Sequence, residues 1–318
     1  MGRFTINEFE GSSFEVSVAD LIALQKSVVQ RRHRVPKQHA GAALAQSKVR
    51  GRGMDFVETR NYYPGDDIRL MDWRVTARTQ KPHVKVFQVE RERPVMIFFD
   101  LAPTQFFGTR VCLKSVLAAK LCALLAWTAR AHGDRVGGYL SSLAKQSLWL
   151  PHAHNSTLIG FLKAVSEGTQ HYEDQKWNDW GNKAYSSIFL KGLKECLKVL
   201  KPGTLLLIVS DWYYEPAVVE PYLMELRRHQ DIILYHTFDL IEQGIQREGL
   251  YPITDGKKVL SMNLYSSAQR EQYQHFCQER TRQWYMLAKK IHVPYVPFSV
   301  ETDLSELVQQ SLLRSLRG

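Results

Sequence analysis

The sequence has few of the features that mark several common protein classes. Its 318 residues contain four cysteines and no C-x-x-C pair, which predicts buried free thiols in a reducing compartment rather than a disulfide framework. No G-x-x-x-x-G-K-[ST] phosphate loop is present, so ATP hydrolysis by this chain is not expected. The longest apolar helical stretch, 116–131, includes Lys120 and is too short to cross a bilayer. The first ten residues lack the apolar segment of a secretory signal, and we predict a cytoplasmic protein, free or peripheral to the inner face of the membrane.

Charge is plentiful but unevenly distributed. The net charge is +10, and residues 1–93 hold 17 Lys/Arg against 11 Asp/Glu. Between Lys26 and Arg52 there are eight basic residues and no acidic one. Such a segment is suited to phosphate backbones, anionic lipid headgroups or an acidic protein surface, and it is equally consistent with a solvated, flexible segment.

Two apolar runs each end in an aspartate. Residues 94–99 lead into Asp100, and residues 204–209 lead into Ser210 and Asp211. Neither run alternates with polar residues, as expected of parallel strands that helices cover on both faces. The carboxyl ends of parallel strands share one edge of the sheet, where open α/β folds bind their ligands. We therefore expect the two aspartates to meet at that edge.

Strand and helix patterns alternate from Pro94 onward. This alternation predicts an α/β domain over 94–318, with a mainly parallel, Rossmann-like sheet flanked by helices. The turn signal Thr254-Asp-Gly-Lys257 predicts a β-hairpin insertion. Residues 1–93 are predicted to form a separate α+β region, with a helix that begins at a capping box at Ser17 and ends near Arg32.

Several uncommon sequence words occur in a fixed order in the first half of the chain. They are G-R-G-M-D-F-V-E-T-R (51–60), Y-P-G-D-D-I-R (63–69), D-W-R-V-T-A-R (72–78), E-R-E-R-P (90–94), Asp100, F-G-T (107–109), Lys114-Ser115, G-D-R-V-G (133–137) and, further on, Ser210-Asp211. Together they closely resemble the bacterial family called domain of unknown function 58, whose core is similar to a von Willebrand factor A domain. The dense part of the resemblance covers residues 50–140.

The resemblance implies a metal-ion-dependent adhesion site, built from a D-x-S-x-S motif, a threonine and a further aspartate. Such a site suits Mg²⁺, which prefers six oxygen ligands and keeps some of its waters, so that a partner carboxylate can take an open position. In this chain the pattern is degenerate: its positions correspond to Asp100, Ala102, Thr104 and Asp211, with Ser186 or Ser187 as a weak substitute for the threonine. Ala102 offers no ligand. The alternative is a vestigial site in which the two aspartates bond to loop amides.

A second group of charged residues lies in 66–78. We predict a structural charge network that locks the N-terminal region onto the core, with an aromatic anchor; its members are Asp66, Asp67, Arg69, Asp72, Trp73, Arg74 and Arg78. The alternative is a catalytic carboxylate cluster, since neighbouring acids shift each other's pKa.

Other residues could have a binding role, but a purely structural role is the simpler interpretation. His152 and His154 have the spacing of metal ligands on a strand, yet no cysteine or carboxylate accompanies them, so we interpret them as loop histidines. A polar, aromatic loop is predicted between Ser166 and Lys183. This loop contains Trp177 and Trp180, and Tyr185 follows it. These three aromatic side chains could stack on nucleic-acid bases or face a protein partner.

Three functions are compatible with these observations. The first is a non-enzymatic protein-interaction or adaptor module, because the resemblance implies a MoxR-type AAA+ ATPase as partner and a client protein to be assembled or matured. The second is a metal-dependent phosphoester hydrolase at Asp100 and Asp211. The third is a nucleic-acid binder that uses the basic segment between Lys26 and Arg52. The sequence shows no evident nucleophile paired with a general base, such as Ser–His or Cys–His. We therefore predict the first function.

Overall fold

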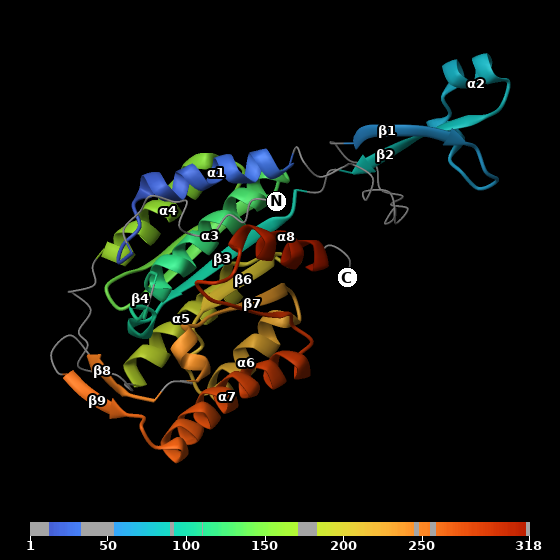
Figure 1. Cartoon of the computed structure of the whole chain (residues 1–318). Coiled ribbons are helices and arrows are strands. Elements are labelled where there is room, and N and C mark those ends of the chain that lie inside the picture. Colours follow the sequence, from blue (N-terminus) through green and yellow to red (C-terminus); the bar gives the residue numbers. More distant parts are fainter. Residues whose placement is uncertain are drawn as a thin grey trace. The chain divides into compact units, whose positions relative to one another are not determined.

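The computed structural model describes residues 13–32, 54–89, 92–109, 111–170, 183–244, 248–254 and 259–315, and the chain divides into two compact units (Figure 1). The larger unit combines residues 1–35 with 93–318, and the smaller unit spans 36–92. The prediction divided the chain at residue 93, whereas this grouping puts the described helix Val18–Arg32 with the sheet.

A six-stranded sheet forms the centre of the larger unit, in the order β10–β7–β6–β3–β4–β5. Its strands are β3 (Pro94–Leu101), β4 (Arg135–Ser142), β5 (Gln146–His152), β6 (Leu205–Ser210), β7 (Asp231–Thr237) and β10 (Tyr295–Phe298). All neighbours are parallel except the edge strand β5, which is antiparallel to β4. From β3 the chain first adds strands on one side and then returns to add β6 on the other. The boundary between β3 and β6 is thus the topological switch point, where open α/β sheets hold their sites.

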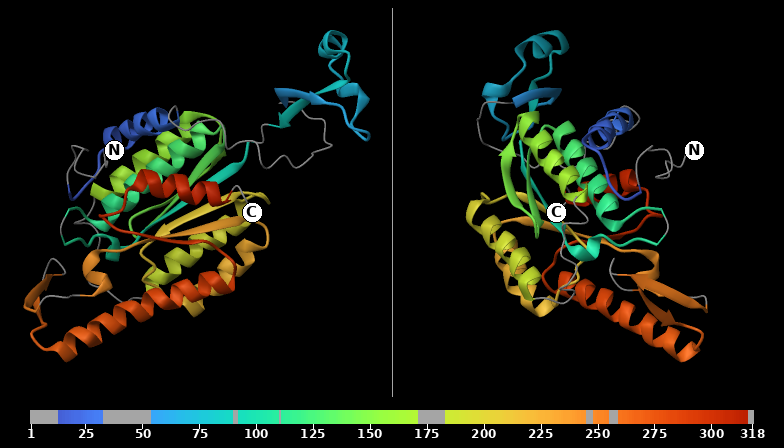
Figure 2. Two further views of the ribbon diagram at one scale, coloured as in Figure 1. Left: turned by 45° about the vertical axis from the view of Figure 1, so that its right-hand side comes forward. Right: turned by 90° about the vertical axis from the view of Figure 1, so that its left-hand side faces the viewer.

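Helices cover both faces of this sheet (Figures 1 and 2). One apolar layer packs β3 and its neighbours against α1 (Val18–Arg32), α3 (Lys114–Ala131), α4 (Asn155–Gln170) and α8 (Leu304–Ser315). The other layer packs the opposite face against α5 (Lys183–Val199), α6 (Pro216–Arg227) and α7 (Ser267–Lys290). A hairpin of β8 (Leu250–Thr254) and β9 (Val259–Asn263) precedes α7, as predicted. The architecture confirms the predicted α/β class, with a mainly parallel sheet between two layers of helices.

Helix α1 joins the larger unit through its apolar face and through hydrogen bonds. Leu21 and Leu24 are buried in the layer that contains α3. The indole of Trp127 donates to the Leu21 carbonyl at 2.9 Å, and the hydroxyl of Ser166 donates to the Val16 carbonyl at 2.7 Å. These contacts bridge more than a hundred residues of sequence, which explains why a division by sequence order separated α1 from its layer.

Two further observations concern the cysteines and the helices. All four cysteines are free and buried, as predicted. Within the described ranges, no helix has both the length and the apolar character needed to cross a bilayer.

The smaller unit is a two-stranded antiparallel sheet of β1 (Met54–Asn61) and β2 (His83–Val89), joined by the short helices η3 (Ile68–Leu70) and α2 (Trp73–Thr79). Its aspartates act locally. Asp66 forms a bidentate pair with Arg60, with both N–O distances 2.8 Å, while Asp67 and Asp72 accept hydrogen bonds as the N-caps of η3 and α2.

The predicted charge network is therefore corrected. Among the described residues, no ion pair joins these aspartates to Arg69, Arg74 or Arg78, and Trp73 is 67% exposed rather than an anchor. Short polar side chains compete for nearby backbone amides at helix starts, and this local use outweighed the longer-range pairing.

Replacing Asp72 by alanine should loosen α2. The Asp72 carboxylate accepts from the amides of Arg74 and Val75, at 3.1 and 3.2 Å. Loss of an N-cap costs about 1 kcal/mol, which corresponds to roughly fivefold faster hydrogen exchange of amides protected by opening of the helix. Exchange measured by NMR or mass spectrometry tests this. Arg74→Ala is the matched control and should leave the exchange rates unchanged; equal effects of the two substitutions would restore a role for the arginine.

Candidate functional site

Asp100 lies near the carboxyl end of β3 and its side chain is fully buried. The hydroxyl of Ser210, at the end of β6, donates to Asp100 Oδ2 at 2.6 Å. The hydroxyl of Tyr214 lies 3.1 and 2.9 Å from the two carboxyl oxygens. Burial raises the pKa of Asp100 to about 8; the Ser210 hydrogen bond opposes this shift and the charge of Asp211 reinforces it. Burial therefore favours the protonated, uncharged form of Asp100.

Asp211 follows β6 directly and forms a buried ion pair with the first residue of α3, Lys114. Lys114 Nζ lies 3.0 Å from Asp211 Oδ2, and the two side chains are 3% and 1% exposed. Burial disfavours the Asp211 carboxylate, but the charge of Lys114, the Thr104 hydroxyl and the Lys114 hydrogen bond together lower the pKa of Asp211. The pKa of Lys114 is raised, because the charges of Asp211 and Glu242 outweigh its desolvation. The pair therefore stays ionised.

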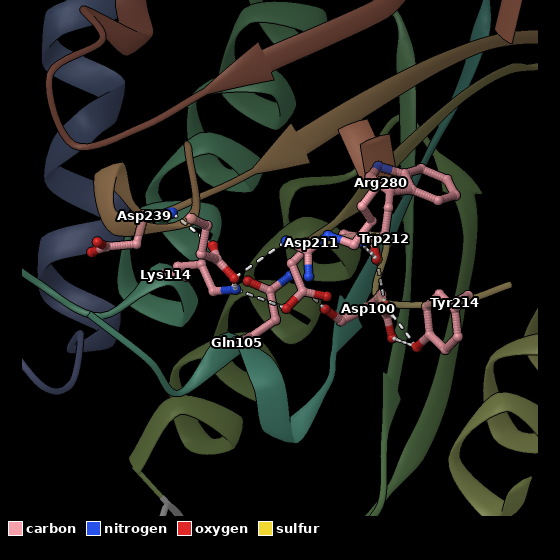
Figure 3. A network of polar contacts seen from close by, with 10 residues as sticks. Asp100, Gln105, Lys114, Asp211, Trp212, Tyr214, Asp239 and Arg280 are labelled. Carbon is pink, nitrogen blue, oxygen red and sulfur yellow. Dashed lines mark hydrogen bonds and ion pairs between the residues drawn. The ribbon is translucent and has the colours of Figure 1, made fainter. Parts of the chain in front are cut away.

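The same ammonium group also binds Glu242, on the short helix η6 (Leu240–Gln243). Lys114 Nζ lies 3.0 and 3.1 Å from the two Glu242 carboxylate oxygens. A guanidinium nitrogen of Arg280, on α7, lies 3.5 Å from Glu242 Oε1, the oxygen that Lys114 also binds. Figure 3 shows this chain of contacts from Lys114 to Asp211 and Arg280 (Figure 3).

Asp239 ties this cluster to the loop before α3. It forms a capping box with Glu242 at the start of η6. It also accepts hydrogen bonds from the amide and the hydroxyl of Thr109, at 2.9 and 2.6 Å. The loops that follow β3, β6 and β7 are thus joined by a continuous polar network.

The turn after Asp211 is held by an aromatic residue in an unusual conformation. Trp212 has a φ of 53°, in the left-handed region that residues other than glycine rarely adopt. Its amide donates to the Ser210 hydroxyl at 2.9 Å and its indole to the Tyr235 carbonyl at 2.9 Å. The ring is fully buried and packs against Trp284, with ring centroids 4.7 Å apart. Packing therefore maintains the backbone conformation that places Asp211.

The structure brings together some of the predicted metal ligands. Asp100 and Asp211 meet at one edge of the sheet, as expected. Thr104 Oγ1 is buried beside Asp211 and stabilises its carboxylate, although its geometry falls short of a full hydrogen bond. Ala102 is buried and caps η4 (Pro103–Gln105) without a side-chain bond. Ser186 and Ser187 lie in the first turn of α5, at the rim of a separate crevice.

These side chains do not fit a Mg²⁺ ion, which prefers six oxygens in near-octahedral geometry. Both carboxyl oxygens of Asp100 already accept hydrogen bonds, and burial raises its pKa, which favours the uncharged form over a carboxylate ligand. Asp211 already binds an ammonium group at 3.0 Å, a charge that would repel a dication. Ala102 supplies no oxygen, and the predicted ligand oxygens that are buried without a hydrogen bond are Thr104 Oγ1 and Asp211 Oδ1, the latter on the carboxylate that the Lys114 charge already neutralises.

A mainly apolar crevice of about 330 Å³ lies beside this polar network. Its lining comes from the starts of α5 and α6 and the segment between β6 and α6: Ser186, Ser187, Leu190, Tyr214, Glu215, Val218 and Val219. Tyr214 joins the two features, because its ring lines the crevice while its hydroxyl bonds Asp100. A volume of this size accommodates one or two apolar side chains of another molecule.

With this geometry described, comparison with known proteins gives a family. The sequence matches the family described as "Protein of unknown function DUF58" over residues 58–283. The chain belongs to this family. The resemblance predicted from the sequence words is thereby confirmed.

Two similar proteins come from mycobacteria. The uncharacterized proteins Rv1480 of Mycobacterium tuberculosis (strain ATCC 25618 / H37Rv) and Mb1516 of Mycobacterium bovis are each 37% identical over 94 residues. The match covers 30% of this chain and 30% of each relative. Among solved structures, the conserved hypothetical protein BatB from Bacteroides thetaiotaomicron aligns with a TM-score of 0.44 and 13% identity, over 71% of this chain and 100% of BatB.

Several residues of the DUF58 site were missed by sequence reasoning. Glu242 and Arg280 are separated from Lys114 by more than a hundred residues, and no local pattern linked them. Lys114 lies in one of the sequence segments that carry the family resemblance. It also begins a helix that has almost no polar face, and this position could have indicated that the lysine is buried. Tyr214 follows Asp211 closely, and its position beside the crevice could not be inferred from spacing.

The remaining sequence candidates lie elsewhere. His152 and His154 stack on each other, and the His154 amide donates to His152 Nδ1 at 3.2 Å, so they form a local turn. The loop predicted from Ser166 is corrected, because α4 continues to Gln170. Tyr185 lies in α5 and stacks on Tyr214, with ring centroids 6.3 Å apart. Trp177, Trp180 and most of the basic segment between Lys26 and Arg52 lie outside the described residues.

Proposed function

We propose that this DUF58 chain is a non-enzymatic protein-interaction module that works with a MoxR-type AAA+ ATPase in the assembly or maturation of client proteins. The partner class comes from the family resemblance, and the proposed place of action is the cytoplasm. The observation that carries the proposal is the state of the strand-edge acids. Asp100 and Asp211 are 0% and 1% exposed, and their charges are removed or paired inside the protein.

Burial of these acids argues against chemistry at this edge. A general base or a nucleophile has to reach its substrate at hydrogen-bonding distance. Asp100 bonds to Ser210 and Tyr214, and Asp211 Oδ2 bonds to Lys114. Asp211 Oδ1 has no hydrogen bond but is buried, so neither carboxyl group is open to an incoming molecule. The internal bonding of these acids instead supports the proposal that this edge of the sheet is a rigid platform on which a partner protein docks.

The crevice beside the platform supplies the contact surface. Val218 on α6 is 46% exposed, and the crevice floor at Val219 is buried. Interaction sites combine an apolar pocket with a polar rim, which here is formed by Ser186, Ser187 and Glu215. We propose that an apolar side chain of the partner enters this crevice.

Replacing Val218 by glutamate should weaken ATPase binding at least about tenfold, because a charge would be buried in the interface. Met224→Glu is the matched control: Met224 lies on the same helix and is 48% exposed, but it does not line the crevice. Calorimetric titration with the purified MoxR-type ATPase of the same genome measures both. Equal affinity of the two variants would contradict docking at the crevice. Steady phosphoester turnover by the purified chain, lost in Asp100→Asn, would overturn the non-enzymatic assignment.

A further inference from the structure

We infer that the ammonium group of Lys114 takes the place of the divalent cation at the strand edge, so that this edge is held together, and binds its partners, without metal. The inference concerns the chain's own residues, and only its consequence for partner binding rests on the proposed function.

Lys114 has the position and the contacts that this role requires. Its ammonium group connects the segment after β6, through Asp211, with η6, through Glu242, and it does so from the first residue of α3. A divalent cation at such an edge would likewise join loops that follow different strands. The face of the Phe107 ring lies 5.9 Å from Nζ and closes another side of the group.

The charges in direct contact balance without an added ion. Lys114 and Arg280 contribute two positive charges, and their partners Asp211 and Glu242 contribute two negative charges. The carboxylate of Asp239, which also belongs to the network, is held by the Thr109 and Ile241 donors instead of by a cation. A dication that entered would have to displace the lysine from a site where its side chain is only 3% exposed. Burial of an uncompensated charge is costly, which makes this exchange unfavourable.

The arrangement also determines what the partner can contribute. A metal site of the adhesion type leaves an open coordination position for a carboxylate. The ammonium group of Lys114 instead donates its hydrogen bonds to Asp211 and Glu242, so it has none to offer a partner's carboxylate. The partner contact is therefore apolar, in the crevice lined by Leu190, Tyr214 and Val218, and insensitive to chelators.

Thermal unfolding of the full chain in MgCl₂, MnCl₂ or EDTA tests the inference without any partner. A site with a Kd of about 0.1 mM would raise Tm by roughly 5–10 °C at about 10 mM ion. We expect no such rise in the unmodified chain. Saturable stabilisation by either ion, confirmed by titration calorimetry, would overturn the inference while leaving the proposed ATPase interaction intact.

Variants at position 114 provide the second arm. In Lys114→Ala the carboxylates of Asp211 and Glu242 lose their cation, so Tm should fall and then recover by at least roughly 3 °C in MnCl₂ or MgCl₂. Lys120→Ala is the matched control, a buried lysine on the same helix with no ion pair among the described residues, and it should not respond. Lys114→Gln serves if the alanine variant does not fold. A folded position-114 variant that ignores both ions would overturn the inference, because a cation site would then not underlie the cluster.

Discussion

Replacing Lys114 by methionine is expected to lower the free energy of unfolding by about 3–5 kcal/mol. The substitution removes a positive charge that lies 3.0 Å from Asp211 and from Glu242, and Asp211 is 1% exposed. A buried carboxylate without its partner bears the full cost of desolvation. Urea denaturation, followed by tryptophan fluorescence, measures the loss.

A double variant separates this charge effect from a packing effect. Asp211→Asn removes the carboxylate that Lys114→Met leaves unpaired, so the combination should be about 1–3 kcal/mol more stable than the sum of the single losses predicts. Lys120→Met, on the same helix and also buried, should cost much less. Strict additivity of the two site variants would contradict the ion-pair interpretation.

Replacing Asp100 by asparagine is expected to flatten the dependence of stability on pH. Burial raises the pKa of Asp100 to about 8 in the folded chain, against about 3.9 in an unfolded chain. Between these values the folded protein keeps a proton that the unfolded chain releases, so the free energy of unfolding falls as pH rises. The contribution is fully present below about pH 4 and lost by about pH 8, with a slope of up to about 1.4 kcal/mol per pH unit.

The test is the difference between the two proteins, measured by urea denaturation at several pH values from about 4 to 8. The unmodified chain should lose stability relative to Asp100→Asn as the pH rises. Burial and the charge of Arg280 lower the pKa of His236 to about 3, which gives an opposite slope at acidic pH. That slope occurs in both proteins and cancels in the difference. Parallel curves would show that Asp100 is already ionised in the folded state.

The sheet and the meeting of its two aspartates could be predicted because they depend on local signals. The unbroken apolar runs before Asp100 and Asp211 marked parallel strands, and parallel strands place their carboxyl ends at one edge. The register confirms the pairing of these strands, with Phe99 beside Val209. The capping box at Ser17 was equally local, and Asp20 accepts from the Ser17 hydroxyl at 2.7 Å.

The content of the site could not be predicted, because it depends on distant pairs. Lys114 finds Asp211 and Glu242 at separations of 97 and 128 residues. A lysine in the first turn of a helix is ordinarily solvated, so the sequence analysis did not include Lys114 among the candidate site residues. In the smaller unit, by contrast, the sequence analysis predicted side-chain ion pairs that were not found, because charged residues lie close together in the sequence. Asp67 and Asp72 bond to neighbouring backbone amides instead.

The long sequence separation between Lys114 and its acids has a consequence for synthesis on the ribosome. The strands β3, β4 and β5 emerge with α3 well before the second half of the sheet exists. Until the segment carrying Asp211 leaves the exit tunnel, the lysine has neither of its counter-charges and must stay hydrated, and Glu242 follows later still. Closure of this edge is thus a late event in synthesis, because both carboxylates that neutralise Lys114 lie about a hundred residues or more downstream of it.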